Sequence, residues 1–238
     1  MPGRRLELIL ERIPPCRLLC DVGTDHGYIP IAAVSSGKAE RAVASDVNPG
    51  PLGRAEENIA VRGLSDRIET VLSDGLENLS GDADVYVISG MGGDLMAGII
   101  GKGTDKIKEG CTLVLQPQSR IPEFRHFLHD SGFAIDDETW TVDAGKTYVV
   151  ITVRRGEQQY DDEVFYAYGF HGITKRDPVL GTFLEGEHEK FQSIITSMEM
   201  EGLRDPAGND ELSSKLELAD RALARIKDQG AGYGKDQV

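Results

Sequence analysis

Hydrophobic positions in residues 1–155 follow two alternating patterns, one with the period of a helix and one typical of buried strands. Residues 4–13 place four apolar side chains on one helical face, and Pro14 ends that helix. Strands are predicted at residues 17–22, 41–46, 68–72, 83–89 and 112–116. Helices are predicted between them, at residues 28–36, 51–62, 94–100 and 122–131. Two longer strands follow, at residues 133–142 and 148–154.

This order of elements predicts an α/β fold. We expect a doubly wound sheet of the class I, Rossmann-like methyltransferase type, in which the last strand is antiparallel. A dinucleotide-binding dehydrogenase would continue with a further strand–helix step instead of a terminal strand hairpin.

The chain changes character after residue 155. Residues 169–177 are expected to form a loop. Apolar side chains then lie near heptad spacing in two runs: Leu184, Phe191, Ile194, Ile195 and Met198, then Leu212, Leu216, Ala219, Leu223 and Ile226. A polar turn, residues 201–210, separates the runs, so we predict a helical hairpin in the form of an antiparallel coiled coil. The expected domains are residues 1–156 and 157–229, followed by a flexible tail at 230–238.

The chain is acidic, with a net charge of −14 over 238 residues. Residues 156–238 carry 9 basic and 17 acidic side chains, so −8 falls on the predicted hairpin and tail and −6 on residues 1–155. Phosphate contacts need local positive potential, so indiscriminate nucleic-acid binding is disfavoured, although a basic patch on one face is compatible with these counts.

Apolar run length, the N-terminal segment and cysteine spacing indicate where the protein acts and whether it binds a metal. Its apolar runs fall short of the roughly 18–20 residues that span a membrane. The N-terminal segment is interrupted by Glu7 and Glu11 and does not resemble a signal peptide. The three cysteines have no metal-ligand spacing and are expected to be free thiols. We therefore expect a cytoplasmic protein without a membrane segment or metal.

Aspartates stand at the ends of three successive predicted strands. They are Asp21, Asp46 and Asp74. Each alone is equally typical of a turn or helix cap. Together they lie at the carboxyl edge of the sheet, where a carboxylate some 20 residues after a glycine turn accepts hydrogen bonds from ribose. Asp74 is placed to reach an adenine amino group.

The first loop contains Asp25 between Gly23 and Gly27, where a diphosphate-binding loop would present glycines and free N–H groups. A carboxylate there would repel a diphosphate. S-adenosylmethionine has no phosphate and carries a sulfonium cation, so opposite charges would attract. His26 has two interpretations: it caps the next helix, or it donates to the cofactor carboxylate.

The fourth strand ends in Ser-Gly-Met-Gly-Gly, residues 89–93. Glycines lack a Cβ, so this corner lets a planar base approach a methyl donor closely. A plain tight turn before a helix is the alternative. We take Asp25, Tyr28 and Met91 as candidate catalytic residues. Tyr28 would either stack on a target base or pack in the core beside the first helix. Asp25 would either accept from the amino group of that base or serve only as a cofactor or loop contact.

Five motifs in order carry a family resemblance. They are Asp-Val-Gly-Thr-Asp-His-Gly-Tyr-Ile-Pro (21–30), Ser-Asp-Val-Asn-Pro-Gly-Pro-Leu (45–52), Ser-Asp-Gly-Leu (73–76), Ser-Gly-Met-Gly-Gly (89–93) and Leu-Gln-Pro-Gln (115–118). Residues 4–155 closely resemble the TrmK family, bacterial methyltransferases acting on N1 of adenine 22 in tRNA. The resemblance implies that S-adenosylmethionine is the cofactor and tRNA the partner, with the hairpin helping to hold tRNA.

The resemblance also assigns residues to ligands. The cofactor-binding candidates are Asp21, Gly23, Asp25, His26, Gly27, Asp46, Val47, Asn48, Asp74, Gly75 and Gly90. The substrate-binding candidates are Arg5, Gln116, Arg120 and Lys146. The three cations among them are expected to form either a basic patch around the mouth of the pocket or a solvated mixed-charge surface. We expect a monomer. Two alternatives stay open: a methyltransferase that acts on a small molecule or protein, and a non-catalytic RNA-binding module that kept the fold.

Overall fold

The computed structural model describes residues 3–202 and 206–228, and the chain forms two compact units. The first unit comprises Met1–Asp137 and Thr141–Gln158, and the second comprises Glu138–Trp140 and Gln159–Val238. The division after Gln158 lies close to the expected boundary at residue 156. The expected tail at residues 230–238 lies outside the described residues.

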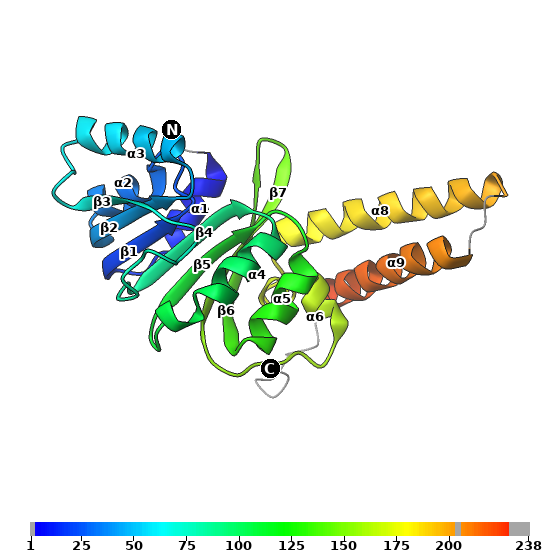
Figure 1. Cartoon of the computed structure of the whole chain (residues 1–238). Coiled ribbons are helices and arrows are strands. Elements are labelled where there is room, and N and C mark those ends of the chain that lie inside the picture. Colours follow the sequence, from blue (N-terminus) through cyan, green and yellow to red (C-terminus); the bar gives the residue numbers. More distant parts are fainter. Residues whose placement is uncertain (1–2, 203–205, 229–238) are drawn as a thin grey trace. The chain divides into compact units, whose positions relative to one another are not determined.

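The chain folds a seven-stranded sheet of order β3-β2-β1-β4-β5-β7-β6 (Figure 1). The strands are β1 (Cys16–Val22), β2 (Ala39–Asp46), β3 (Ile68–Leu72), β4 (Val85–Met91), β5 (Thr112–Pro117), β6 (Phe133–Asp143) and β7 (Lys146–Arg155). Strands β1 to β5 pair in parallel, and β7 pairs antiparallel with β5. The predicted class I, Rossmann-like sheet with an antiparallel last strand is confirmed.

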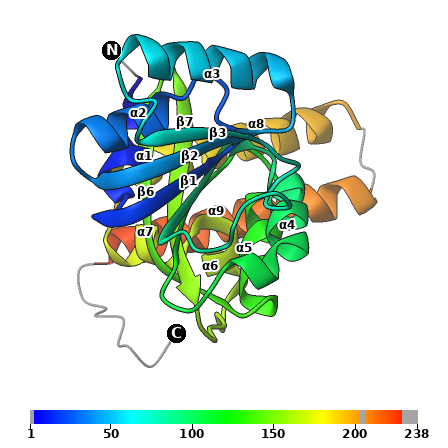
Figure 2. The same ribbon diagram turned by 60° about the vertical axis from the view of Figure 1, so that its left-hand side comes forward.

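Helices cover both faces of this sheet (Figure 2). They are α1 (Arg4–Arg12), α2 (Tyr28–Ser35), α3 (Pro49–Val61), α4 (Gly93–Lys102) and α5 (Ile121–Asp130), with a short 3₁₀ turn η1 (Thr104–Lys106) that was not predicted. Strand order reverses direction between β1 and β4, so right-handed crossovers place α2 and α3 on one face and α4 and α5 on the other. Ligands of such sheets bind at the carboxyl edge beside this reversal.

Helix α1 is held at both of its ends. The Arg5 amide donates to Asp143 Oδ2 at 3.3 Å near the start of the helix. At the other end, Lys38 Nζ donates to the carbonyls of Leu10 and Ile13 at 2.7 and 2.9 Å. These bonds satisfy an amide at the start of the helix and carbonyls at its end, and they fix the helix that carries Arg5.

The second unit contains four helices within the described residues: α6 (Glu163–Tyr168), α7 (Phe170–Thr174), α8 (Pro178–Met200) and α9 (Pro206–Lys227). Glu185 pairs with Lys227 at 3.2 Å and His188 with Asp220 at 2.6 Å, so α8 and α9 run antiparallel. The predicted helical hairpin is therefore confirmed. Its regular coiled-coil geometry stays a prediction, since Ile194 on the expected seam is 38% exposed.

Two boundaries in the second unit differ from the prediction. Residues 169–177 were expected to be a loop, but α7 occupies much of that segment. Gly169, at φ +91°, separates α6 from α7 and turns the Phe170 ring onto those of Tyr160 and Phe165, 5.6 and 5.0 Å away between centroids. The turn expected at 201–210 is also too long, because α9 begins at Pro206.

No helix of the described residues has the length and apolar character needed to cross a membrane.

Candidate functional site

The loop after β1 is fixed to the neighbouring strand β2. The amides of Gly23 and Thr24 both donate to the Ser45 carbonyl, at 2.8 and 2.9 Å. Gly23 has φ +77°, and a Cβ added there would lie 2.2 Å from Met91 Cε. The predicted residues Gly23 and Met91 are thus in close contact, and the β4 corner packs against the first loop.

Asp21 lies at the base of this loop and is almost completely buried. Thr24 Oγ1 donates to Asp21 Oδ2 at 2.6 Å. Burial raises the pKa of Asp21 to about 7; the Thr24 hydrogen bond opposes the rise, and the nearby charge of Asp46 adds to it. A carboxylate of this kind is ready to ionise when a cation reaches it.

Asp25 is exposed and adopts a left-handed backbone conformation, with φ +50°. Its carboxylate accepts from Arg54 Nη2 at 2.8 Å and lies 3.4 Å from His26 Nε2. Arg54 comes from α3, on the next strand–helix step, so it forms an ion pair that the sequence pattern did not predict. Any cation that uses Asp25 competes with Arg54 for the carboxylate.

Tyr28 opens α2 and leaves half of its surface exposed. Its ring stacks with that of His26, with centroids 5.3 Å apart and planes inclined by 28°. Gly27 between them has φ +72°, which lets the loop turn into the helix. The His26–Tyr28 pair therefore presents an aromatic surface beside the first loop.

Asp46 ends β2 as predicted. Its Oδ1 atom accepts from the Asn48 amide at 2.8 Å. Within residues 3–202 and 206–228, no hydrogen bond occupies Oδ2, so this atom has free acceptor capacity. Val47 and Asn48 follow on the surface. This arrangement suits a ligand with hydroxyl groups.

Gly90 lies at the corner where β4 ends and has φ +77°. Its amide donates to Gln116 Oε1 at 3.2 Å, and Arg5 Nη1 donates to the same oxygen at 2.8 Å. The Arg5 guanidinium also lies over the Tyr148 ring, 5.7 Å from its centroid. Gln116 is fully buried, so its side chain holds Arg5 and the corner in place; it does not offer a surface contact to a substrate.

A pocket of about 320 Å³ opens among these residues, and we call it the strand-edge pocket. Six predicted residues line it: Arg5, Asp21, Gly23, Asp25, Tyr28 and Gly90. A separate pocket of about 130 Å³ contains the predicted residues Asp74 and Gly75, where a Cβ on Gly75 would lie 3.0 Å from Ile99. The predicted residues Asp21, Gly23 and Asp25, from β1 and the loop after it, therefore line one cavity. The predicted residues after β3, Asp74 and Gly75, line another.

Three of the four predicted substrate residues line neither pocket: the buried Gln116, Arg120 and Lys146. Arg120 directly precedes α5, at φ +54°, and pairs with Glu123 at 3.1 Å and Asp94 at 3.6 Å. Lys146 is exposed at the start of β7. In the described part of the chain, no group of three or more His, Cys, Asp or Glu side chains is arranged to hold a metal.

Comparisons with known proteins identify the family. Residues 3–151 match a family described as a methyltransferase domain. A curated Bacillus subtilis relative, tRNA (adenine(22)-N(1))-methyltransferase, is 32% identical over 234 residues, which cover 96% of this chain and 98% of the relative. The chain belongs to the TrmK family. The crystal structure of B. subtilis TrmK has a TM-score of 0.84 at 29% identity, covering 94% of this chain and 99% of that chain.

A Streptococcus pneumoniae structure extends the comparison to the cofactor. It is solved in complex with S-adenosyl-L-methionine, is 30% identical, and has a TM-score of 0.84 over 94% of this chain and 100% of that chain.

Sequence reasoning missed several residues of this TrmK-family site. Leu6, Thr24, Ser89 and Gln118 line the strand-edge pocket, and Arg54 pairs with Asp25. Gln118 stands in the Leu-Gln-Pro-Gln motif, so the motif itself was the available signal. Because β5 ends at Pro117, Gln118 turns to the pocket while Gln116 stays buried. Arg54 carried no comparable signal.

Proposed function

We propose that this chain transfers the methyl group of S-adenosylmethionine to N1 of adenine 22 in tRNA. The observation that carries the proposal is the match to the B. subtilis enzyme along 96% of this chain and 98% of that relative. It includes both the sheet and the helical hairpin, so it concerns a whole protein and not a shared cofactor domain. The strand-edge pocket supplies independent support.

The residues of this pocket fit the proposed cofactor. S-adenosylmethionine carries a sulfonium and an ammonium cation, and the pocket contains two carboxylates, Asp21 and Asp25. Asp46 does not line the strand-edge pocket, and we assign its free Oδ2 atom to the ribose hydroxyls. Gly90 leaves room for a planar base, since it has no side chain. We assign cofactor binding to these residues together with Asp74 and Gly75, which line the separate pocket of about 130 Å³.

The reaction needs no strong general acid or base from the protein. When bound, S-adenosylmethionine supplies an electrophilic methyl group. Adenine N1 already has a lone pair and carries no proton, so the residues of the chain act by orienting the base and excluding water. Because N1 is hidden in a paired base, the adenosine must leave its pairing. We assign the exposed Tyr28 ring to stacking on it.

The proposed function is tested with purified full-length protein, tRNA and S-adenosylmethionine. Mass spectrometry of the digested tRNA should detect 1-methyladenosine, and a tRNA with guanosine in place of adenosine 22 should gain none. Methylation of that altered tRNA at an equal rate, or no methylation of either tRNA, would contradict the proposal.

The Asp46 assignment has a direct test. Asp46→Ala should lose two hydrogen bonds to the ribose, about 1–3 kcal/mol in total, which weakens S-adenosylmethionine binding roughly 5- to 150-fold. Asp66→Ala removes an exposed carboxylate from the same unit and serves as the matched control. Calorimetry that finds equal cofactor affinities for the two variants would remove Asp46 from the site.

Substitutions of Asp25 and Arg54 should change S-adenosylmethionine affinity in opposite directions. Asp25→Asn should weaken S-adenosylmethionine binding, whereas Arg54→Gln should strengthen it because the carboxylate is released from its ion pair. Asp25 is exposed, so solvent screening limits each effect to about 0.5–1 kcal/mol, or two- to fivefold.

Two ligands and a control separate charge from shape at this loop. S-adenosylhomocysteine has no sulfonium charge, so its affinity should change less than that of S-adenosylmethionine in both variants. Arg17→Gln removes an arginine near Asp84, at the opposite edge of the sheet, and should leave both affinities unchanged. Equal changes for the two ligands would refute a role of Asp25 toward the sulfonium.

We infer that the protein acts in the cytoplasm as a single chain. Its three cysteines are free, which is usual in a reducing compartment. Light scattering that detects a stable dimer of the active protein would contradict the monomer.

A further inference from the structure

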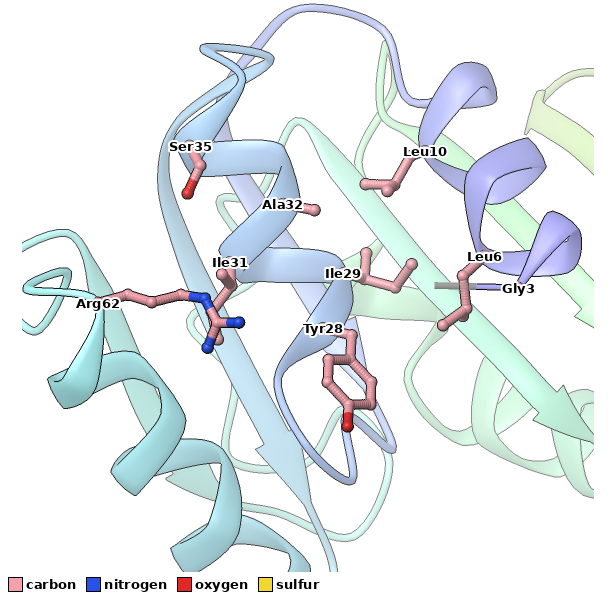
Figure 3. A pocket seen from close by; sticks show the side chains of 9 residues that line it. All are labelled: Gly3, Leu6, Leu10, Tyr28, Ile29, Ile31, Ala32, Ser35 and Arg62. Carbon is pink, nitrogen blue, oxygen red and sulfur yellow. The ribbon is translucent and has the colours of Figure 1, made fainter. Parts of the chain in front are cut away.

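A second cavity of about 620 Å³ lies in the first unit between α1 and α2, and we call it the helix cavity (Figure 3). Its floor consists of apolar side chains, among them Leu6, Leu10, Ile29 and Ala32. No acidic side chain lines it within the described part of the chain. The helix cavity therefore differs in chemistry from the strand-edge pocket, which holds two carboxylates and suits a cationic ligand.

The two cavities are adjacent. Leu6, Tyr28 and Ile29 line both of them, so they are separated by about the thickness of one side chain. Figure 3 shows the Tyr28 ring projecting from the start of α2 beside Ile29. A polynucleotide that places one base in the strand-edge pocket brings its neighbouring nucleotide within reach of the helix cavity.

Arg62, which follows α3, lines the helix cavity on the opposite side of α2 from Leu6 and Leu10 and supplies a positive charge there (Figure 3). It is exposed, and its hydrogen bond is a long 3.5 Å contact with the Asn58 carbonyl. Arg62 forms no ion pair with a described residue, whereas many other arginines of this acidic chain do, such as Arg54 and Arg120. A guanidinium without a carboxylate partner is available to a phosphate.

The described cations of the helical hairpin are less available. Arg221 and Arg225 both pair with Asp162. Lys190 and Lys227 pair with Glu187 and Glu185, at 3.0 and 3.2 Å. The guanidinium of Arg62 is thus more available to a phosphate than these paired side chains.

We propose that the helix cavity binds a second unpaired nucleotide of the tRNA, adjacent in the chain to the target adenosine. Its base packs on the apolar floor beside Tyr28, whose ring we assign to the target adenosine, and its phosphate contacts Arg62. Packing of an unpaired base and pairing of its phosphate with arginine are interactions by which proteins hold single-stranded nucleotides. This inference rests on the proposed function, since it requires tRNA as the substrate.

The test combines a protein variant whose helix cavity is filled with tRNAs that lack one base near the target. Ala32→Trp places a large side chain in the helix cavity, and Ala60→Trp places the same side chain on the exposed surface of α3 as the control. Each full-length variant is assayed with tRNAs that carry one abasic nucleotide within two positions of the target. S-adenosylmethionine affinity within twofold of wild type shows that each variant is folded.

For the wild type and Ala60→Trp, one abasic position should lower kcat/KM about tenfold, which lies within the range for losing one bound base. Ala32→Trp should lower kcat/KM on intact tRNA by a similar factor and be almost insensitive to that abasic position, because the two changes remove the same contact. Wild-type-like activity of Ala32→Trp, or equal sensitivity of both variants at every position, would overturn the proposal.

Arg62 is tested separately, so the inference does not depend on one variant. Losing one phosphate contact should reduce the slope of log affinity against log salt by about 0.7–0.9 in Arg62→Gln. Arg41→Gln removes an exposed arginine from the amino-terminal part of β2 and should leave the slope unchanged. An unchanged slope in both variants would refute the phosphate contact. A wild type that methylates no tRNA would instead refute the proposed function itself.

Discussion

Asp21→Asn should stabilise the ligand-free protein at pH 8 and weaken cofactor binding. Burial raises the pKa of Asp21 from 3.8 to about 7, and this difference corresponds to on the order of 4 kcal/mol. At pH 8 the wild type must keep an ionised carboxylate in a buried position. Asparagine keeps an oxygen that accepts the Thr24 hydrogen bond and carries no charge.

The pH dependence separates this effect from a general change in packing. As pH rises from about 4 to 7, the unfolded chain has already released the Asp21 proton while the folded chain retains it. Wild-type stability should therefore be highest below pH 4 with respect to this group, fall through that window and level off above it. Urea unfolding should show the stability gain of Asp21→Asn over the wild type growing from pH 4.5 to pH 8.

Cofactor binding should change in the opposite direction. We assign the ionised Asp21 carboxylate to the cofactor ammonium, so wild-type affinity should rise between pH 6 and pH 8, and Asp21→Asn should bind more weakly without this rise. Asp66→Asn is the exposed control and should match the wild type in both assays. A stability difference that stays constant with pH would show that Asp21 does not titrate in this range.

The predicted and unpredicted parts of this site differ in the distance over which their residues interact. Asp21, Asp46 and Asp74 were predicted because alternating strands and helices place strand ends at one edge of a sheet. The contact of Arg5 with Gln116 joins residues 111 positions apart, and the ion pair of Arg54 with Asp25 joins residues 29 apart. Such pairs depend on packing that periodicity does not describe.

Helix α7 illustrates a different limit. Its segment has no helical repeat of apolar residues, and glycines at 169 and 172 favour a loop. The structure forms a helix there because the ring of Phe170 enters an aromatic cluster with those of Tyr160 and Phe165. Tertiary packing outweighs local propensity at this position.

The glycines of residues 89–93 also serve purposes that their spacing alone does not separate. We predicted that they open space for a base, and Gly90, which lines the strand-edge pocket, fits that role. Gly93 is different, because a Cβ there would lie 2.8 Å from the carbonyl oxygens of both Ser119 and Arg120. Its amide also donates to the Ser119 carbonyl at 2.8 Å. Gly93 therefore lets the chain after β5 approach the start of α4.

Gly93→Ala should consequently be strongly destabilising. The new methyl group would meet two backbone carbonyls that cannot rotate away, so the cost should lie near or above the upper end of the roughly 1–3 kcal/mol typical of overpacking. Gly98→Ala is the matched control in the same helix, where a Cβ meets no atom within 4 Å. It should stabilise the protein by about 0.5–1 kcal/mol, since alanine favours a helix interior over glycine.

Urea unfolding of the two variants decides whether close packing or helix propensity governs α4. Opposite signs of the stability change support the packing role of Gly93, and stabilisation by both substitutions would contradict it. Cofactor affinity gives a second measure. The displaced segment leads from Gln118, which lines the strand-edge pocket, into α5. Gly93→Ala should therefore weaken S-adenosylmethionine binding under conditions in which the variant is fully folded.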